Sequence, residues 1–364
     1  KGMSNMNDMG SLRTPICDLL GCRYPVIQTA MGYVAGADLV IGTTNAGGFG
    51  FLAGATIPAD RIEAEILRVK RETDDQPFGL NFHMFQPNAQ QLLDLAVKYR
   101  LRAVSYGRGP DKKVIGRLRD AGIVCMPTVG ALKHAQKAIE MGANAITVQG
   151  GEGGGHTGSV PTTVLLPQVV DAVEVPVIAA GGFYDGRGLL AALAYGASGI
   201  AMGTRFLMTS DSKVPAATLQ RYLAARDAEK IAISHLVDGM PQRMIPNEYL
   251  AMLEKASPMK RLRIALGLAL QWKAETGMTT GQALSIFMKA MREDSSSVAQ
   301  TVMAANAPML LQRSMVDGNP AEGVMSAGQV AALIGRLDSC EEVIGGIVRQ
   351  AMDRRNALNA LTPA

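Results

Sequence analysis

The segment "PVIAAGGFYDGRGLLAALAYGASGIAMGTRF", residues 176–206, carries the clearest indication of the fold. It begins and ends with short runs, at 176–182 and 199–206, that are apolar at successive positions, as strands buried on both faces of a parallel sheet are. Asp185 stands between the two runs, where its carboxylate would cap the N-terminus of a connecting helix. The segment therefore predicts two parallel strands joined by a helix.

The same kind of apolar run occurs six more times upstream, at 26–30, 48–53, 78–83, 103–106, 123–129 and 145–150. Helical segments lie between the runs, for example at 59–73, 111–122 and 131–143. Eight such strand–helix units predict a (β/α)8 TIM barrel. A doubly wound parallel sheet is the alternative, because alternation alone does not separate the two folds. The count of eight and the late position of the glycine-rich loops favour the barrel.

The pattern changes after about residue 210, where no further strand alternates with the helices. Four segments there are helical in period and composition, at 215–232, 247–256, 259–277 and 280–294. The segments 326–337 and 340–358 are expected to return to the barrel. We therefore predict a barrel domain formed by 14–210 and 326–358, and a second, all-α domain over 211–325.

The charge balance excludes some classes of partner. Thirty-six Lys and Arg residues against 32 Asp and Glu residues give a formal net charge of +4. This near balance, with no basic block, argues against nucleic-acid binding. No apolar run approaches the ~18 residues that a membrane span needs, so we expect no membrane association.

Cysteine and histidine spacing give no sign of a disulfide framework or a metal site. The four cysteines (17, 22, 125 and 340) form no C-x-x-C pair and are typical of reduced thiols, which predicts a cytoplasmic protein. The first ten residues have no apolar core, so no secretory signal is expected. The histidines, at 83, 134, 156 and 235, do not have the spacing of metal ligands.

Glycines mark the ends of the last two predicted strands, the place where TIM barrels commonly bind phosphate. Gly181 and Gly182 end the seventh strand, and Gly203 and Thr204 end the eighth. Glycine lets backbone amides approach an anion closely, and a helix N-terminus adds a favourable dipole. These loops predict a phosphate site, with tight turns as the alternative role of the glycines.

The segment "VQGGEGGGHTG", residues 148–158, contains six glycines and His156. Each ordered glycine costs roughly 0.5–1 kcal/mol relative to alanine, through lost backbone freedom. A loop that keeps six of them is expected to run close to another group.

Several of these motifs together resemble one known family. "PVIQTAMGYVAGADL", "FGLNF", "VQGGEGGGHTG", the 176–206 segment and "SAGQV" are similar to the motifs of the nitronate monooxygenases, formerly called 2-nitropropane dioxygenases. The resemblance runs from about residue 14 to 355. It implies an enzyme that binds flavin mononucleotide (FMN) on a TIM barrel with a helical second domain, and that oxidises a nitronate or a similar stabilised carbanion with oxygen.

The resemblance also implies roles for individual residues. Gln28, Ala30 and Met31 would line the flavin ring, while Asn81 and Gln149 would hydrogen-bond its edge or ribityl chain. Gly151 would let the backbone pass close to the cofactor, where side chains would collide. The phosphate would be held by Gly181, Gly182, Gly203 and Thr204, and the ring would be covered by Ser326, Gly328 and Gln329.

His156 matches the catalytic histidine of the family. An imidazole with a pKa near 6.5 accepts and gives a proton at neutral pH, so His156 is expected to move the substrate proton. His83, at the end of the third strand, could also face the cavity, and its role stays open.

The C-terminal half also resembles a subgroup of flavin oxidoreductases linked to bacterial steroid-ring breakdown, which act on coenzyme A thioesters. The stretches that carry this likeness are "MGTRFLMTSDS", "VDGMPQR" (237–243) and "MAANAPMLLQRSMVDG" (303–318). In that case Arg205, Lys213 and Arg243 could meet the phosphates of coenzyme A. A surface or capping charge is their alternative role.

Three functions therefore stay open. The first is oxidation of a nitronate with oxygen, and the second is FMN-dependent dehydrogenation or reduction of an acyl-coenzyme A. The third is a phosphate-binding barrel without redox chemistry. The sequence does not decide whether NAD(P)H reduces the flavin, nor the oligomeric state, a homodimer included.

Overall fold

The computed structural model describes residues 12–276, 281 and 307–361, with 85, 87 and 108 left out. Eight parallel strands form a closed barrel in the order β1-β2-β3-β4-β5-β6-β8-β9. The barrel closes because β9 pairs with β1, with Val26 opposite Ile200 and Gln28 opposite Met202. Closure confirms the barrel and excludes the doubly wound sheet. The strands are β1 (Val26–Gln28), β2 (Phe49–Ala53), β3 (Gly79–Asn81), β4 (Ala103–Tyr106), β5 (Val124–Val129), β6 (Ile146–Gln149), β8 (Val177–Ala180) and β9 (Gly199–Met202).

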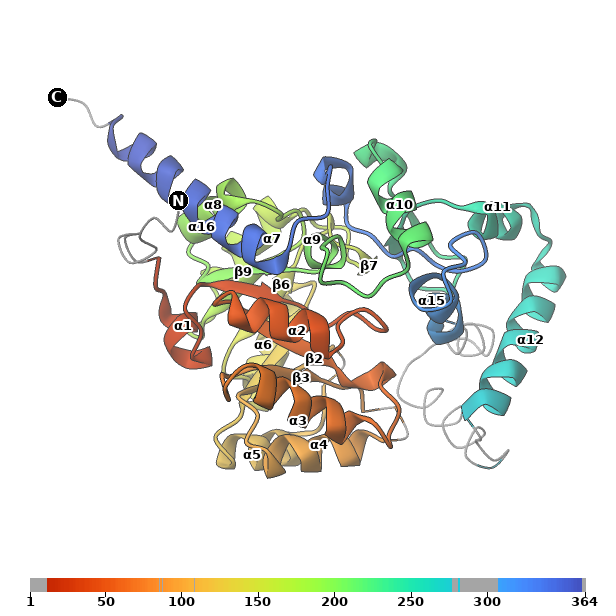
Figure 1. The fold of residues 1–364 in the computed structure, drawn as a ribbon, viewed down its shortest axis with the longest axis horizontal. Helices are drawn as coiled ribbons and strands as arrows, with labels where there is room; N and C mark the ends of the chain where they lie inside the picture. The colour runs from red at the N-terminus through yellow and green to blue at the C-terminus, as the bar shows by residue number, and fades with distance from the viewer. Residues whose placement is uncertain are drawn as a thin grey trace.

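Helices surround the barrel on the outside (Figure 1). The predicted cap at Asp185 is confirmed, since its carboxylate accepts hydrogen bonds from the amides of Arg187 and Gly188 at the start of α8. The short α1 packs three fully buried residues, Ile16, Cys17 and Leu20, into the same apolar cluster as Ile27 and Phe49 of the barrel. The helices of this part are α1 (Pro15–Leu20), α2 (Ala37–Asn45), α3 (Ile62–Glu72), α4 (Ala89–Lys98), α5 (Lys112–Asp120), α6 (Leu132–Met141), α7 (Thr162–Val170), α8 (Gly186–Ala194) and α9 (Thr204–Leu207), with a 3-10 turn at Gly54–Thr56.

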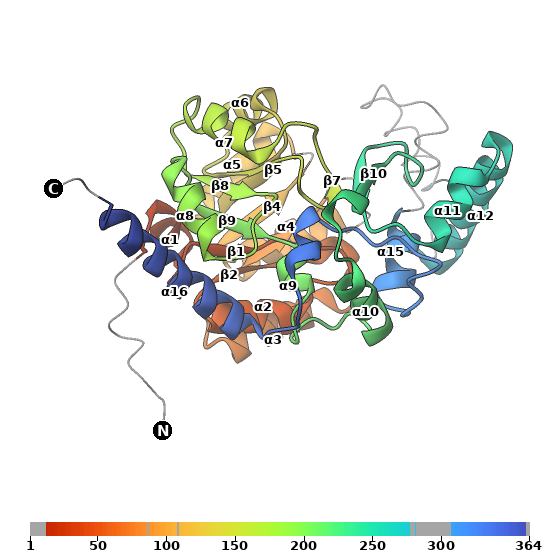
Figure 2. The same ribbon diagram turned by 90° about the horizontal axis from the view of Figure 1, so that it is seen from above.

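The described helices between α9 and the C-terminal segment gather on one side of the barrel (Figures 1 and 2). They are α10 (Ala216–Ala224), α11 (Glu248–Lys255), α12 (Pro258–Thr276) and α15 (Ala307–Met315), with a 3-10 turn at Ala228–Lys230. The predicted helix at 280–294 lies outside the described residues, apart from residue 281.

This second part is mainly helical rather than all-α, which amends the prediction. The predicted helix at 215–232 ends with α10, and β10 (Ala232–Ser234) follows it. β10 pairs antiparallel with β11 (Gln242–Met244), and β11 pairs with β7 (Gly155–His156) from the glycine-rich loop. These strands are two or three residues long, too short to give the alternating pattern that identifies a strand in sequence.

The C-terminal segment packs against the barrel helices. A 3-10 turn at Gln329–Leu333 precedes α16 (Cys340–Asn359), which begins with a capping box between Ser339 and Glu342. α16 runs along the outside of the barrel beside α2 and α8 (Figure 2). The Gln350 side chain accepts a 2.7 Å hydrogen bond from the amide of Gly186. The exact division into 14–210 plus 326–358 and 211–325 stays a prediction.

Ile344→Ala tests how much α16 contributes to the stability of the barrel. Ile344 is fully buried, so truncation should lower the free energy of unfolding by about 2–5 kcal/mol. Leu358→Ala, on the same helix but 58% exposed, is the control and should change it by less than about 0.5 kcal/mol. Equal effects of the two substitutions in urea denaturation would contradict this packing.

Candidate active site

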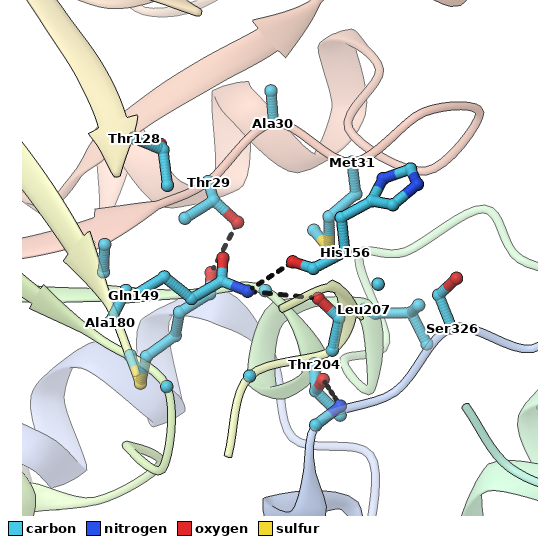
Figure 3. Close-up of a pocket in the computed structure, with 18 of the residues that line it drawn as sticks. Thr29, Ala30, Met31, Thr128, Gln149, His156, Ala180, Thr204, Leu207 and Ser326 are labelled. Carbon is cyan, nitrogen blue, oxygen red and sulfur yellow. Dashed lines mark hydrogen bonds between the residues drawn. The ribbon is translucent and has the colours of Figure 1, made fainter. Parts of the chain in front are cut away.

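A cavity of about 340 Å³ opens at the carboxyl ends of the strands. Its volume lies in the range of small-molecule and cofactor sites. The wall is built from the ends of β1, β5, β6, β8 and β9, from the loop 152–156, and from two segments far along the chain, 307–315 and 326–330 (Figure 3). The site therefore lies where TIM-barrel enzymes place their chemistry.

Ten of the fourteen predicted site residues line this cavity: Ala30, Met31, Gln149, His156, Gly181, Gly182, Gly203, Thr204, Ser326 and Gly328. Their roles toward a ligand stay predictions. Sequence reasoning missed other parts of the wall, including Thr29, Thr128, Glu152 and Gln242.

The four remaining predicted residues are not part of the cavity wall. Gln28 is fully buried, and its amide donates to the carbonyls of Thr29 and Phe51. The Asn81 amide donates to the Ser105 backbone and hydroxyl oxygens, both at 3.0 Å.

The other two of these four hold neighbouring loops together. The carbonyl of Gly151 accepts two hydrogen bonds from Arg243, at 2.9 and 3.1 Å. The side-chain amide of Gln329 donates to Ala228, and its backbone amide donates to the carbonyl of Glu152.

The glycine-rich loop lines the cavity, but it is also packed tightly against the protein itself. A Cβ on Gly154 would lie 2.5 Å from backbone atoms of Ala327 and Gly328. The resemblance implies that the loop has glycines because larger side chains would collide with a cofactor. The structure adds a more direct reason, the close approach of the 326–328 segment.

Gln149 supports this loop from inside the barrel. Its side-chain amide donates to the carbonyl of His156 at 2.9 Å and to that of Gly154 at 3.5 Å (Figure 3). The loop carrying His156 is thus held from one side by Gln149 of β6 and from the other by β11.

The ends of β8 and β9 form an open cradle. Gly181 and Gly182 have φ angles of +88° and +84°, a conformation that favours glycine. A Cβ on Gly182 would approach only the Glu152 side chain, at 3.7 Å, so space remains over this turn. The Glu152 carboxylate in turn accepts hydrogen bonds from the amide and hydroxyl of Thr162, at the start of α7. On the other side of the cradle, the Thr204 hydroxyl accepts a 2.9 Å hydrogen bond from the amide of Gly328.

The His156 ring lies against two side chains that sequence reasoning did not find. Its Nε2 lies 2.6 Å from Oδ2 of Asp238 and 3.1 Å from the side-chain amide of Gln242. Burial would raise the pKa of Asp238, but the hydrogen bond and charge of His156 and the hydrogen bonds from Met240 and Gln242 together hold that pKa below its usual value. The two residues lie in "VDGMPQR", yet their partner is more than 80 positions away, so spacing gave no signal.

His83 stands near enough to His156 for their charges to interact. Partial desolvation, together with the charge of His156, lowers the pKa of His83 below its usual value. A lowered pKa keeps this imidazole neutral at pH 7.

The three basic residues considered for coenzyme A phosphates all contact protein groups. Arg205 is buried and donates to Asp338 at 2.6 Å. Arg243 donates to Gly151 and, at 2.7 Å, to Ile231. The exposed Lys213 lies 3.7 Å from the Asp38 carboxylate. Arg205 and Arg243 therefore have structural roles.

The described part of the chain contains neither a membrane-spanning helix nor a cluster of metal ligands. No helix there is long and apolar enough to cross a membrane. No group of three or more His, Cys, Asp or Glu residues in that part could hold a metal ion.

Comparison with known proteins identifies the family. The model of the nitronate monooxygenase family matches residues 13–92 and 86–350. The chain belongs to this family, and it is an oxidoreductase. A flavin is the cofactor that the family implies.

The similar proteins carry several names. A Rhodococcus jostii protein named (3aS,4S,5R,7aS)-5-hydroxy-7a-methyl-1-oxo-octahydro-1H-indene-4-carboxyl-CoA dehydrogenase is 46% identical over 353 residues, which cover 97% of this chain and 99% of that protein. A probable nitronate monooxygenase from Staphylococcus saprophyticus is 30% identical over 287 residues, which cover 66% of this chain and 80% of that protein. The structure of FabK from Thermotoga maritima matches with a TM-score of 0.76 and 27% identity, over 97% of this chain and all of that one.

Arg243→Met tests whether this guanidinium holds the glycine-rich loop. The substitution leaves the buried carbonyl of Gly151 without its donors, and should lower the free energy of unfolding by about 1–3 kcal/mol. Arg221→Met removes an exposed ion pair with Glu248 and should cost less than about 1 kcal/mol. A change at Arg243 no larger than at Arg221, in chemical denaturation, would show that the loop does not depend on it.

Proposed function

We propose that this protein is an FMN-dependent dehydrogenase that oxidises a ring hydroxyl group of a carbocyclic acyl-coenzyme A. The observation that carries the proposal is the extent of the match to the Rhodococcus dehydrogenase, which spans nearly the whole of both chains. The match to the probable nitronate monooxygenase spans only two thirds of this chain. Nitronate oxidation is therefore the second candidate.

The residues around the cavity fit FMN. The Gly181–Gly182 turn and the start of α9 at Thr204 offer backbone amides for its phosphate. Ala30 and Met31 would offer an apolar surface to the flavin ring, and Gln149 would offer a polar one. Ser326 and Gly328 line the same cavity. When bound, FMN would supply the acceptor for a hydride.

His156 would act as the general base of this reaction. Oxidation of a secondary alcohol breaks one C–H and one O–H bond and forms a C=O bond. The imidazole of His156 would take the hydroxyl proton, and a bound flavin would supply the acceptor for the hydride with its electron pair. His156 borders the cavity, and its link to the Asp238 carboxylate would stabilise the positive charge that this proton brings.

The test is anaerobic reduction of the bound flavin. A hydroxylated carbocyclic acyl-coenzyme A should bleach the blue absorbance and yield a stoichiometric amount of ketone. A nitronate or NAD(P)H should bleach it more slowly, by a factor of at least about ten. Bleaching by a nitronate alone would overturn the proposal in favour of the second candidate, and a colourless protein that does not bind FMN would overturn both.

His156→Ala should lower kcat by about 10²–10⁴-fold, because the reaction loses its general base, while the flavin stays bound. His134→Ala, an exposed imidazole on α6, is the matched control and should leave kcat unchanged. Stopped-flow flavin reduction measures both variants. Normal turnover by the His156 variant would contradict the acid–base role.

Gly182→Asp should expel FMN, because it adds a negative charge beside the phosphate. Gly182→Asn is nearly isosteric and tolerates the positive φ angle about as well as Asp, so it controls for backbone strain. The flavin content of the purified variants should fall at least tenfold for Asp relative to Asn. Equal flavin content would count against the phosphate cradle.

A further inference from the structure

We propose that Asp238 is the positioning residue for His156, and that it fixes which ring nitrogen is free to take the substrate proton. This inference rests on the proposed function for the identity of the substrate and for the role of His156 as the base. It assigns a purpose to the 237–243 segment, which the barrel fold and the cofactor do not explain.

The first observation is the way the Asp238 carboxylate is used. Its side chain is only 3% exposed, and each of its two oxygens has a separate partner. Oδ1 accepts a 3.0 Å hydrogen bond from the amide of Met240, which fixes the local turn. Oδ2 lies 2.6 Å from Nε2 of His156 and 2.5 Å from the Gln242 amide. The carboxylate is therefore held by its own segment and directed at the imidazole.

The second observation is what these contacts imply for the imidazole. The amide of Gln242 donates to Asp238, and the low pKa of Asp238 keeps it ionised, so Oδ2 only accepts. The 2.6 Å contact between Nε2 of His156 and Oδ2 has a donor only if Nε2 carries the hydrogen. The 3.1 Å approach of the Gln242 amide to Nε2 is then a contact between two donors, because that amide donates to Asp238 instead. The lone pair of the neutral ring then lies on Nδ1, the nitrogen that has no hydrogen bond among the described residues. Asp238 thus selects the tautomer whose base is Nδ1.

The third observation is that the same segment holds the backbone on both sides of His156. Gln242 pairs with His156 and Arg243 with Gly155 in the β11–β7 ladder. The amide of Thr157 donates to the carbonyl of Pro241 at 3.2 Å. A change in the 237–243 segment would therefore move the histidine as well as its partner.

Other charged groups surround this pair less closely. His83 interacts with His156 through its charge, and Glu152 interacts in the same way with Arg243. Among the described residues, only Asp238 forms an ion pair with the His156 ring. Removal of the Asp238 carboxylate should therefore change the tautomer of the His156 ring.

The first experiment reads the tautomer directly in the flavin-loaded protein labelled with ¹⁵N-histidine. The chain has only four histidines, so the His156 signals can be assigned by their loss in His156→Ala. The unmodified protein should show hydrogen on Nε2. In Asp238→Asn, Oδ1 keeps its bond to Met240 and the new NH₂ group faces Nε2, so the hydrogen should move to Nδ1. Asp238→Glu keeps a carboxylate and should keep hydrogen on Nε2.

The second experiment measures kinetics with the hydroxylated acyl-coenzyme A. Asp238→Asn should lower kcat by about 10²–10⁴-fold, the range of general-base contributions, with KM changed by less than about threefold. Asp227→Asn makes the same chemical change at an exposed cap and should leave kcat as it is.

Rescue by a conservative variant separates positioning from a loss of folding. Asp238→Glu keeps a carboxylate as the acceptor for Nε2, so its kcat should fall less than that of Asp238→Asn. A merely structural role would favour Asp238→Asn instead, because that variant keeps the size and shape of the side chain.

A hydrogen on Nδ1 in the unmodified protein, or an unchanged His156 spectrum in Asp238→Asn, would overturn the inference. Normal turnover by Asp238→Asn would do the same. If no hydroxylated acyl-coenzyme A reduces the flavin, the proposed function fails, while the spectrum still decides the role of Asp238.

Discussion

The close approach of three chain segments at the mouth of the barrel is the constraint on which the rest of the site depends. The glycine-rich loop lies between the 326–328 segment and β11, and a side chain at Gly154 would not fit there. This packing turns His156 toward Asp238 and leaves the ends of β8 and β9 open as a cradle. The loop glycines therefore serve the assembly of the protein as much as the approach of a ligand.

The barrel and the second part of the chain contribute different residues to the site. The barrel supplies the strand ends and glycine turns on which, in the proposed function, the flavin phosphate would bind. The second part supplies Gln242, Leu311 and Met315 to the wall, together with the carboxylate behind His156. In the proposed function, this second part would face the substrate, so differences there would separate acyl-coenzyme A chemistry from nitronate chemistry.

Sequence alone predicted the barrel well, because each of its eight strands is mainly apolar and almost every strand residue is buried. The cradle glycines were also found, since they end strands whose positions were clear. The strands β10 and β11 were missed because three residues carry no periodicity. Asp238 and the packing reason for Gly154 were missed because both depend on partners far along the chain.

A crystal structure of the protein with FMN would show whether the glycine turns bind the phosphate and whether His156 faces the flavin. We expect the phosphate on the amides of Gly181, Gly182 and Thr204, and the flavin ring in the cavity beside Nδ1 of His156. A flavin bound elsewhere, or a ring lying out of reach of His156 with the imidazole turned to solvent, would contradict it.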